Sequence, residues 1–205
     1  MQLSSWLPTS LLALALSLAG CAYPPPDRAW VTLIDGDQGL NNFNRVGDAN
    51  WRAEGGAIVA DQGKSGFLVS REAYQDFVIY AEFWAATDTN SGIFIRAADP
   101  GKITADNAYE VNVWDIRPDP MYATAAIVNF AAVPVPTVYK AGGQWNRLEI
   151  RAQGDELSVR FNGVDTVRVR DGKWPRGPFA LQFGPGVKGA TGGPIRWRKV
   201  QIKPL

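Results

Sequence analysis

Two runs of sequence decide the fold: Asn90-Ser91-Gly92-Ile93-Phe94-Ile95-Arg96 and Tyr109-Glu110-Val111-Asn112-Val113-Trp114-Asp115. Apolar and polar side chains alternate at a period of two along both runs, which is typical of strands that bury one face. Between them, Asp99-Pro100-Gly101 is a turn signal that stops any strand from running through. The stretch therefore predicts two adjacent strands joined by a glycine-containing loop.

The alternation divides each run into two faces. The apolar face comprises Ile93, Ile95, Tyr109, Val111 and Val113. If both apolar sets point into the same core, Arg96 and Glu110 point out of the same face of the sheet, with Asn112 and Trp114 beside Glu110. A carboxylate, an amide, an indole and a guanidinium on one face form our candidate site. The alternative is that Arg96 and Glu110 form only a structural ion pair between neighbouring strands.

The N-terminal segment predicts export and lipid attachment. Residues 1–21 contain no Asp, Glu, Lys or Arg, and Leu11 to Ala19 is a Leu and Ala run with one Ser, typical of a signal-peptide core. It ends in Leu18-Ala19-Gly20-Cys21, which resembles the lipobox of bacterial lipoproteins. We therefore expect residues 1–20 to be a signal peptide, residues 21–29 to be the lipidated Cys21 and a Pro-rich spacer, and residues 30–205 to be one domain. The alternative is an ordinary secretory signal with a coincidental Cys.

Lipidation at Cys21 predicts a protein anchored in the bacterial cell envelope. A small uncharged residue after the lipidated Cys goes with outer-membrane sorting in lipoproteins, and Ala22 fits that rule. We therefore expect the membrane to be a partner through this anchor, with the domain facing the periplasm.

Composition excludes several classes of function. The 205 residues include 21 Lys and Arg against 20 Asp and Glu, for a formal net charge of +1, and there is no basic run. This balance argues against nucleic-acid binding. His is absent, which removes His-based triads, His metal sites and imidazole acid-base chemistry. We predict neither a metal nor a cofactor.

The rest of the mature chain predicts further strands. Asp76 to Trp84 alternates in a way that suits a central strand with a core on one side and an aromatic cleft on the other. Asn162-Gly163 followed by Val164 to Val169 is the strongest hairpin signal. No stretch of the mature chain holds a sustained helical period, so we predict an all-β antiparallel sandwich, with a closed barrel as the less favoured alternative.

Taken in order, these pieces resemble the 3-keto-disaccharide hydrolase domain family. The matching pieces are Trp51 with Gly55-Gly56, Tyr74 with Asp76-Phe77, Ala81-Glu82-Phe83, Asn90 to Arg96, Tyr109-Glu110-Val111, Gln144 to Ile150, Asn162-Gly163, Leu181-Gln182 and Ile195 to Arg198. The resemblance implies a jelly-roll β-sandwich of the concanavalin A-like type. It also implies a small carbohydrate ligand, which is a glycoside oxidised to a ketone at C3 of the sugar. The family is expected to cleave this glycoside by elimination and rehydration.

The resemblance assigns roles to particular residues. A carboxylate would remove the C2 hydrogen that the C3 ketone acidifies, and a cation would stabilise the enolate. The catalytic candidates are Glu110 as base, Arg96 as enolate stabiliser, and Glu82 or Asp115 as a second acid-base group, with Glu82 preferred. The candidate sugar-binding residues are Asn112, Gln182, Trp84, Trp114, Tyr80 and Phe94.

Two other functions stay open. Many members of the family carry a His just beyond the Leu-Gln pair, where this chain has Phe183, which favours a surface lipoprotein that binds carbohydrate without catalysis. A retaining β-glucanase on the same sandwich would need two carboxylates on one strand face, roughly 5 Å apart. The partner of Glu110 on its face is Asn112, which argues against the glucanase.

Overall fold

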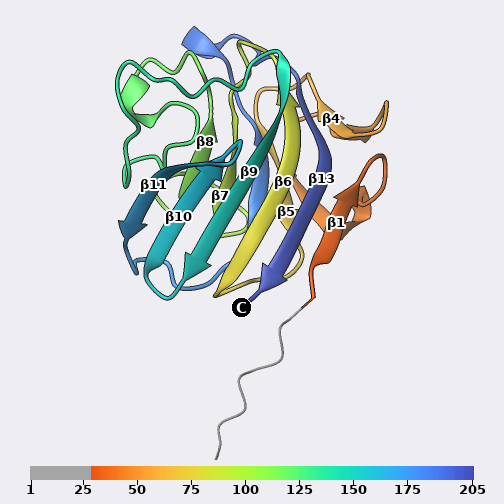
Figure 1. Ribbon diagram of the computed structural model, residues 1–205. Helices are drawn as coiled ribbons and strands as arrows, with labels where there is room; N and C mark the ends of the chain where they lie inside the picture. Colours follow the sequence, from red (N-terminus) through yellow and green to blue (C-terminus); the bar gives the residue numbers. More distant parts are fainter. Residues whose placement is uncertain (1–28) are drawn as a thin grey trace, which may run out of the picture.

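The computed structural model describes residues 29–205, which form two antiparallel sheets packed face to face (Figure 1). The predicted signal peptide, Cys21 and nearly all of the spacer lie outside the described residues. The first sheet has the order β11 (Val164–Arg170), β10 (Glu156–Phe161), β9 (Gln144–Gln153), β6 (Phe77–Ala85), β13 (Ile195–Pro204), β4 (Ile58–Ala60) and β3 (Arg52–Ala53), and β1 (Val31–Asp35) also pairs with β13. The second sheet has the order β2 (Phe43–Gly47), β5 (Gly66–Ser70), β12 (Ala180–Phe183), β7 (Ser91–Ile95) and β8 (Tyr109–Val113). The predicted all-β sandwich is thus confirmed.

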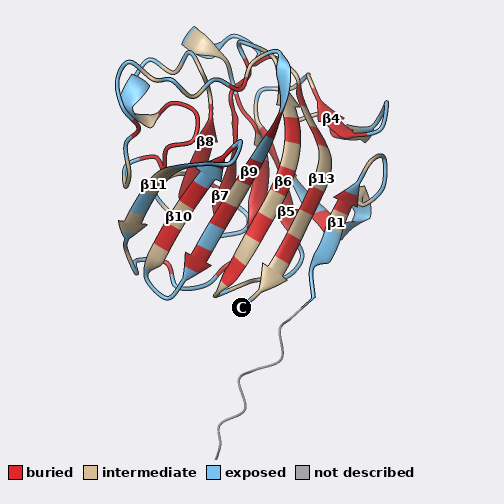
Figure 2. Cartoon of the chain, viewed as in Figure 1, coloured by how far each residue is buried: buried red, intermediate tan, exposed pale blue. Residues whose placement is uncertain are grey.

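The core lies between the two sheets and follows the alternation of the strands. Along β6, buried positions alternate with half-buried ones from Phe77 to Ala85, as the alternating colours of Figure 2 show. Ile93, Val111 and Leu181 of the second sheet pack into the same core as Phe83 and Trp197 of the first. Each strand therefore presents one face to the core and the other outward.

The outward face of the second sheet is also covered. Every residue of β5, β7 and β8 is buried. A second apolar cluster lies on this outward face and includes Phe67, Phe94, Ala180 and Ile103, the last from the loop between β7 and β8. Polar side chains on this face are consequently held in a largely dry environment.

The free edge of β8 is closed by a loop segment. The backbone N–H of Ala125 donates to the carbonyl of Asn112, the N–H of Asn112 donates to Ala126, and the N–H of Val128 donates to the carbonyl of Glu110. Residues 125–128 thus continue the hydrogen bonding of the second sheet beyond its last strand.

The strongest predicted turn is confirmed. β10 and β11 pair around Asn162 and Gly163, which have φ of 49° and 84°, the left-handed values that a tight hairpin of this type needs. Within residues 29–205, no helix is long and apolar enough to cross a membrane. The helical segments are the short 3-10 turns η1 (Leu40–Asn42), η2 (Pro120–Tyr122) and η3 (Val187–Gly189).

Candidate functional site

The candidate site lies on the outward face of the second sheet, where β12, β7 and β8 run side by side. β7 and β8 pair so that Phe94 lies opposite Glu110 and Gly92 lies opposite Asn112. On the other side of β7, Leu181 lies opposite Ile93, which puts the next residue, Gln182, across from Gly92. Glu110, Asn112 and Gln182 therefore share one face; the alternation predicts this for Glu110 and Asn112, and Gln182 is the candidate that the resemblance adds.

Gly92 allows β7 and β8 to lie close together beside these polar side chains. A Cβ atom at this position would lie 2.8 Å from the carbonyl oxygen of Val111 and 3.6 Å from Cγ of Glu110. The first distance is shorter than a real contact, so a larger residue could not fit without shifting β8. The glycine is thus required by the backbone of β8, and the Glu110 side chain lies within contact distance of this position on β7.

Glu110 is buried without a partner for its carboxylate. The residue is 7% exposed, and its carboxylate makes no hydrogen bond or ion pair within the described part of the chain. Burial raises the pKa of Glu110 to about 7, and the nearby positive charge of Arg117 opposes that rise. A carboxyl group with this pKa can both take up and release a proton at neutral pH, as a general base must.

Other polar atoms in this region also lack partners. Oδ1 of Asn112, Oε1 of Gln182, Nε1 of Trp114 and Nε of Arg117 are buried and make no hydrogen bond among residues 29–205. Most buried polar atoms in proteins are hydrogen-bonded. Two acceptors and two donors near the Glu110 carboxyl group are therefore unpaired, and a water molecule or a polar ligand that entered this region would find partners for its own polar groups.

Arg117 is a site residue that the sequence did not indicate. It follows β8 by four positions, its guanidinium lies 5.7 Å from the ring centroid of Trp114, and it interacts electrostatically with Glu110. No periodic pattern includes it, because it lies in a loop. A single signal could have identified it: it is the first cation after the strand that carries Glu110.

The predicted placement of Arg96 beside Glu110 is wrong. β7 ends at Ile95, and Arg96 has φ of 54°, which turns its side chain out of the alternation of the strand. The guanidinium is fully buried; its Nε donates to the carbonyl of Gln75 and its Nη1 to the carbonyl of Gly154, each at 2.8 Å, and it pairs with Asp76 at 3.2 Å. Arg96 therefore links the two sheets at one end and forms no ion pair with Glu110.

Three other predicted residues lie on the opposite side of the sandwich. Tyr80, Glu82 and Trp84 occupy outward positions of β6, which belongs to the first sheet. Glu82 accepts a hydrogen bond from Tyr80 at 2.5 Å and one from Arg198 at 2.7 Å. Their predicted location in one cleft with Glu110 is wrong, because β6 pairs with β9 and β13 rather than with β8.

Asp115 and Phe94 have structural roles rather than roles in the candidate site. The Asp115 carboxylate accepts hydrogen bonds from the Thr124 hydroxyl at 2.6 Å and from the backbone N–H groups of Ala141 and Gly142. Phe94 is 2% exposed and packs edge-on against Phe67, so it offers no free ring face to a sugar.

Within residues 29–205, no group of three or more acidic, Cys or His side chains could hold a metal ion.

Phe183 does not line the candidate site. It is fully buried and belongs to the core between the sheets, together with Leu181 and Phe179. The side chain at this position therefore points away from the face that carries Glu110. The departure from the family pattern at Phe183 leaves the polar groups of that face unchanged.

The raised pKa predicts a pH-dependent cost of burying Glu110. A carboxyl group whose pKa is raised by folding binds its proton more tightly in the folded state, so its contribution to stability is lost as pH rises from 4.5 to about 7. Relative to Glu110→Gln, we expect the free energy of unfolding of the unmodified protein to fall by up to about 3 kcal/mol over this range. Urea unfolding of both proteins at several pH values measures the difference, and parallel curves would contradict the raised pKa.

Comparisons with solved structures support the fold. A crystal structure provisionally described as a glycosyl hydrolase, from Parabacteroides distasonis, is 20% identical with a TM-score of 0.67, covering 86% of this chain and all of that one. The carbohydrate-binding module CBM66 from Bacillus subtilis is 15% identical with a TM-score of 0.55, covering 87% of this chain and 97% of that one. A Bacillus subtilis protein with a galectin-like fold is 11% identical with a TM-score of 0.59, covering 83% and 93%. At sequence identities this low, the structural similarity shows that the fold is shared and carries no information about activity.

Sequence comparison gives a more specific result. A family model described as a 3-keto-alpha-glucoside-1,2-lyase-like domain matches residues 29–203. The search of curated proteins found no match. The match spans both sheets, including β7, β8 and β12.

Proposed function

This chain belongs to the 3-keto-alpha-glucoside-1,2-lyase-like domain family, and from that premise we propose that it cleaves glycosides carrying a ketone at C3 of the sugar. The observation that supports this proposal is the buried, unpartnered carboxyl group of Glu110 with its pKa near 7. Such a group suits removal of a carbon-bound proton, because an ordinary ionised carboxylate in water is a much weaker base.

The proposed reaction begins at C2 of the keto sugar. Glu110 takes the C2 proton, and the electron pair of that bond forms an enolate with the C3 carbonyl. The enolate then re-forms the ketone as the bond between C1 and the glycosidic oxygen breaks, leaving a double bond between C1 and C2. The leaving oxygen takes up a proton, and water then adds across the double bond to complete the cleavage.

Neighbouring side chains supply the other functions that this step needs. The Arg117 guanidinium provides positive charge close to Glu110, where it can stabilise the negative charge of the enolate. The free amide oxygens of Asn112 and Gln182 can accept hydrogen bonds from sugar hydroxyls and so orient the ring. Trp114, half-buried at the end of the same row, can contact the sugar or its leaving group.

The proposal is tested with a chromogenic 3-keto-glucoside and the matching glucoside that retains its C3 hydroxyl. We expect release of the chromogen from the keto substrate only, because only the ketone acidifies C2. Deuterium at C2 should slow the reaction. Equal release from both glucosides would indicate direct hydrolysis and contradict the elimination, as would a keto substrate in which C2 neither loses deuterium nor shows an effect of deuterium on the rate.

A second candidate function is carbohydrate binding without turnover at the same face. The fold that this chain shares with the carbohydrate-binding module CBM66 supports this second function. Tryptophan fluorescence titration with the keto substrate separates the two functions. Saturable quenching with no chromogen release would favour binding alone, whereas release favours the enzyme.

Substitution of Gln182 tests how the substrate is oriented without destabilising the protein. Its Oε1 atom is buried without a partner, so Gln182→Leu should leave the unfolding temperature unchanged or slightly higher. Loss of one hydrogen bond to the substrate should raise KM roughly tenfold. Steady-state kinetics measure this, with Gln201→Leu on the opposite sheet as the control. An unchanged KM for Gln182→Leu would show that this amide does not contact the substrate.

A further inference from the structure

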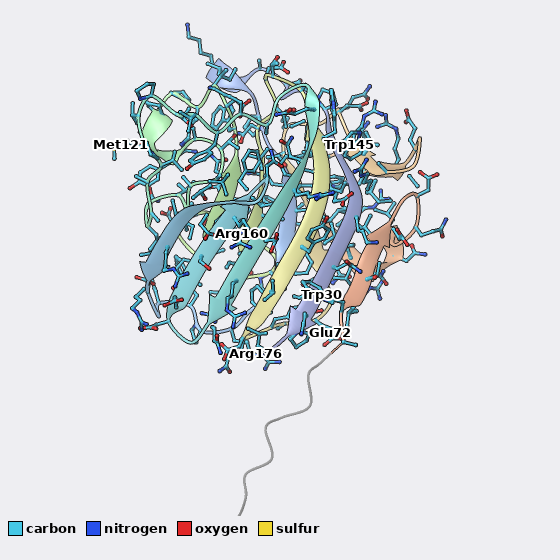
Figure 3. The ribbon with its side chains drawn as sticks, viewed as in Figure 1. Trp30, Glu72, Met121, Trp145, Arg160 and Arg176 are labelled. Atoms are coloured by element: carbon cyan, nitrogen blue, oxygen red, sulfur yellow. The ribbon has the colours of Figure 1, made fainter. Side chains whose placement is uncertain are left out.

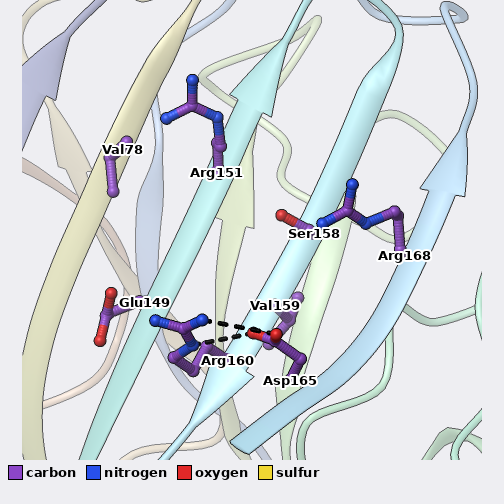
Figure 4. A pocket seen from close by; sticks show the side chains of 8 residues that line it. All are labelled: Val78, Glu149, Arg151, Ser158, Val159, Arg160, Asp165 and Arg168. Atoms are coloured by element: carbon purple, nitrogen blue, oxygen red, sulfur yellow. Dashed lines mark hydrogen bonds and ion pairs between the residues drawn. The ribbon is translucent and has the colours of Figure 1, made fainter. Parts of the chain in front are cut away.

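Two adjoining hollows lie on the outward face of the first sheet, on the side of the sandwich opposite Glu110. One has a volume of about 390 Å³ and is bordered by Trp145, Arg147 and Arg198. The other has a volume of about 260 Å³ and is bordered by Arg151, Arg160 and Arg168 around Ser158 (Figure 4). Glu149 lines both hollows, so they adjoin at this residue, and we call the two together the outer groove.

Trp145 forms a fixed aromatic surface at one end of the outer groove. Its side chain is 40% exposed, and Figure 3 shows it on the first sheet, above Arg160. The Arg198 guanidinium lies 4.3 Å from the ring centroid of Trp145 and is itself held by Glu82 at 2.7 Å. Arg198 covers one face of the indole and holds it in place, so a sugar ring can stack on the opposite face with little loss of side-chain entropy.

Arginines dominate the charge of the outer groove. Five line it, namely Arg147, Arg151, Arg160, Arg168 and Arg198. Glu149 and Asp165 also line it, and Glu82 and Glu156 on the same face pair with Arg198 and Arg168. With these four carboxylates counted, the five arginines leave the groove a positive excess, and Arg151 has no carboxylate partner in the described part of the chain.

The ion pairs already present can be exchanged for contacts with a ligand. Arg160 pairs with Asp165 at 2.8 Å and Arg168 pairs with Glu156 at 3.0 Å, but the Arg160 and Arg168 side chains are 46% and 67% exposed. Exposed pairs of this kind contribute little to stability. Arg151 donates to Gln153 and has no carboxylate partner in the described part of the chain.

We propose that the outer groove binds an acidic polysaccharide. A sugar ring stacks on Trp145, and carboxylate or sulfate groups further along the chain bind Arg151, Arg160 and Arg168. From Trp145 to Arg151 the groove follows β9 for six residues, roughly 20 Å, which suits an oligosaccharide segment rather than a single sugar. This site does not depend on the chemistry proposed for Glu110.

Affinity electrophoresis in gels containing polygalacturonate tests the proposal, with dextran as the neutral polysaccharide. We expect the purified protein to be retarded by polygalacturonate alone, and less so as salt is added. Trp145→Ala should weaken binding at least tenfold, whereas Trp30→Ala, at the similarly exposed Trp30 outside the groove, should not. The double variant Arg160→Ala/Arg168→Ala should also weaken binding, whereas Arg45→Ala on β2 should not.

Further measurements separate a polysaccharide site from unfolding of a variant and from general attraction of polyanions. Thermal unfolding shows whether each variant is folded, and Glu110→Gln should bind polygalacturonate like the unmodified protein. Equal binding to dextran would overturn the acidic specificity. Binding to polyaspartate or to anionic phospholipid vesicles that is equally strong and insensitive to Trp145→Ala would show a general polyanion surface and overturn the polysaccharide site.

Discussion

Glu110→Gln is expected to lower kcat/KM for a 3-keto-glucoside by at least about a hundredfold, the usual size of a general-base contribution. The substitution keeps the shape of the side chain but removes the group that accepts the C2 proton. In the unmodified protein, kcat/KM should rise with pH and level off above about pH 7, because burial raises the pKa of Glu110 to about 7 and only the ionised form can act as base. Steady-state kinetics across pH 5 to pH 9 measure both effects.

A matched control distinguishes loss of the base from a general effect of removing a carboxylate. Glu149 is a half-buried glutamate on the opposite sheet, so Glu149→Gln should leave kcat/KM unchanged. Glu110→Gln should also retain its fold, because an amide at this position is neutral and avoids burial of a charge. A Glu110→Gln variant that retains more than half of the activity would exclude Glu110 as the base.

Arg96→Met should lower the free energy of unfolding by about 3–5 kcal/mol, the range found when one member of a buried ion pair is removed. The guanidinium is fully buried and satisfies the carbonyls of Gln75 and Gly154 as well as Asp76. Methionine fills part of the volume but donates no hydrogen bond, so these acceptors lose their partner. Urea unfolding measures the change, with Arg45→Met, at an exposed arginine, expected to stay within about 0.5 kcal/mol.

The same variant tests whether Arg96 acts in catalysis. If Arg96 is structural, folded Arg96→Met at low temperature should keep the kcat of the unmodified protein. A loss of stability below about 1 kcal/mol together with a large loss of kcat would instead support the catalytic role that the sequence suggested.

The sequence predicted the face that carries Glu110 because alternation survives along the whole of β8. Tyr109, Val111 and Val113 enter the core, so Glu110 and Asn112 must point outward. The same argument failed one residue beyond β7, where Arg96 takes a positive φ. Nothing in the local sequence marks that change, because positive φ is usually signalled by Gly or Asn.

Tyr80, Glu82 and Trp84 show a second limit of pattern analysis. Alternation along β6 correctly separates core positions from outward ones. It does not say which sheet contains the strand, because pairing partners such as β9 and β13 are distant in sequence. The strands β1, β2 and β5 were not predicted at all; β2, for example, exposes Asn44 and Arg45 and has only one buried residue.

The loop segment that hydrogen-bonds to β8 has a consequence for solubility. The strand that carries Glu110 ends its sheet, and an uncovered terminal strand can recruit the same strand of another molecule and start aggregation. Residues 125–128 occupy that edge, so a second chain has no free row of backbone groups to pair with there. The protein can therefore keep a strongly apolar pair of strands around its candidate site at high concentration without those strands joining from molecule to molecule.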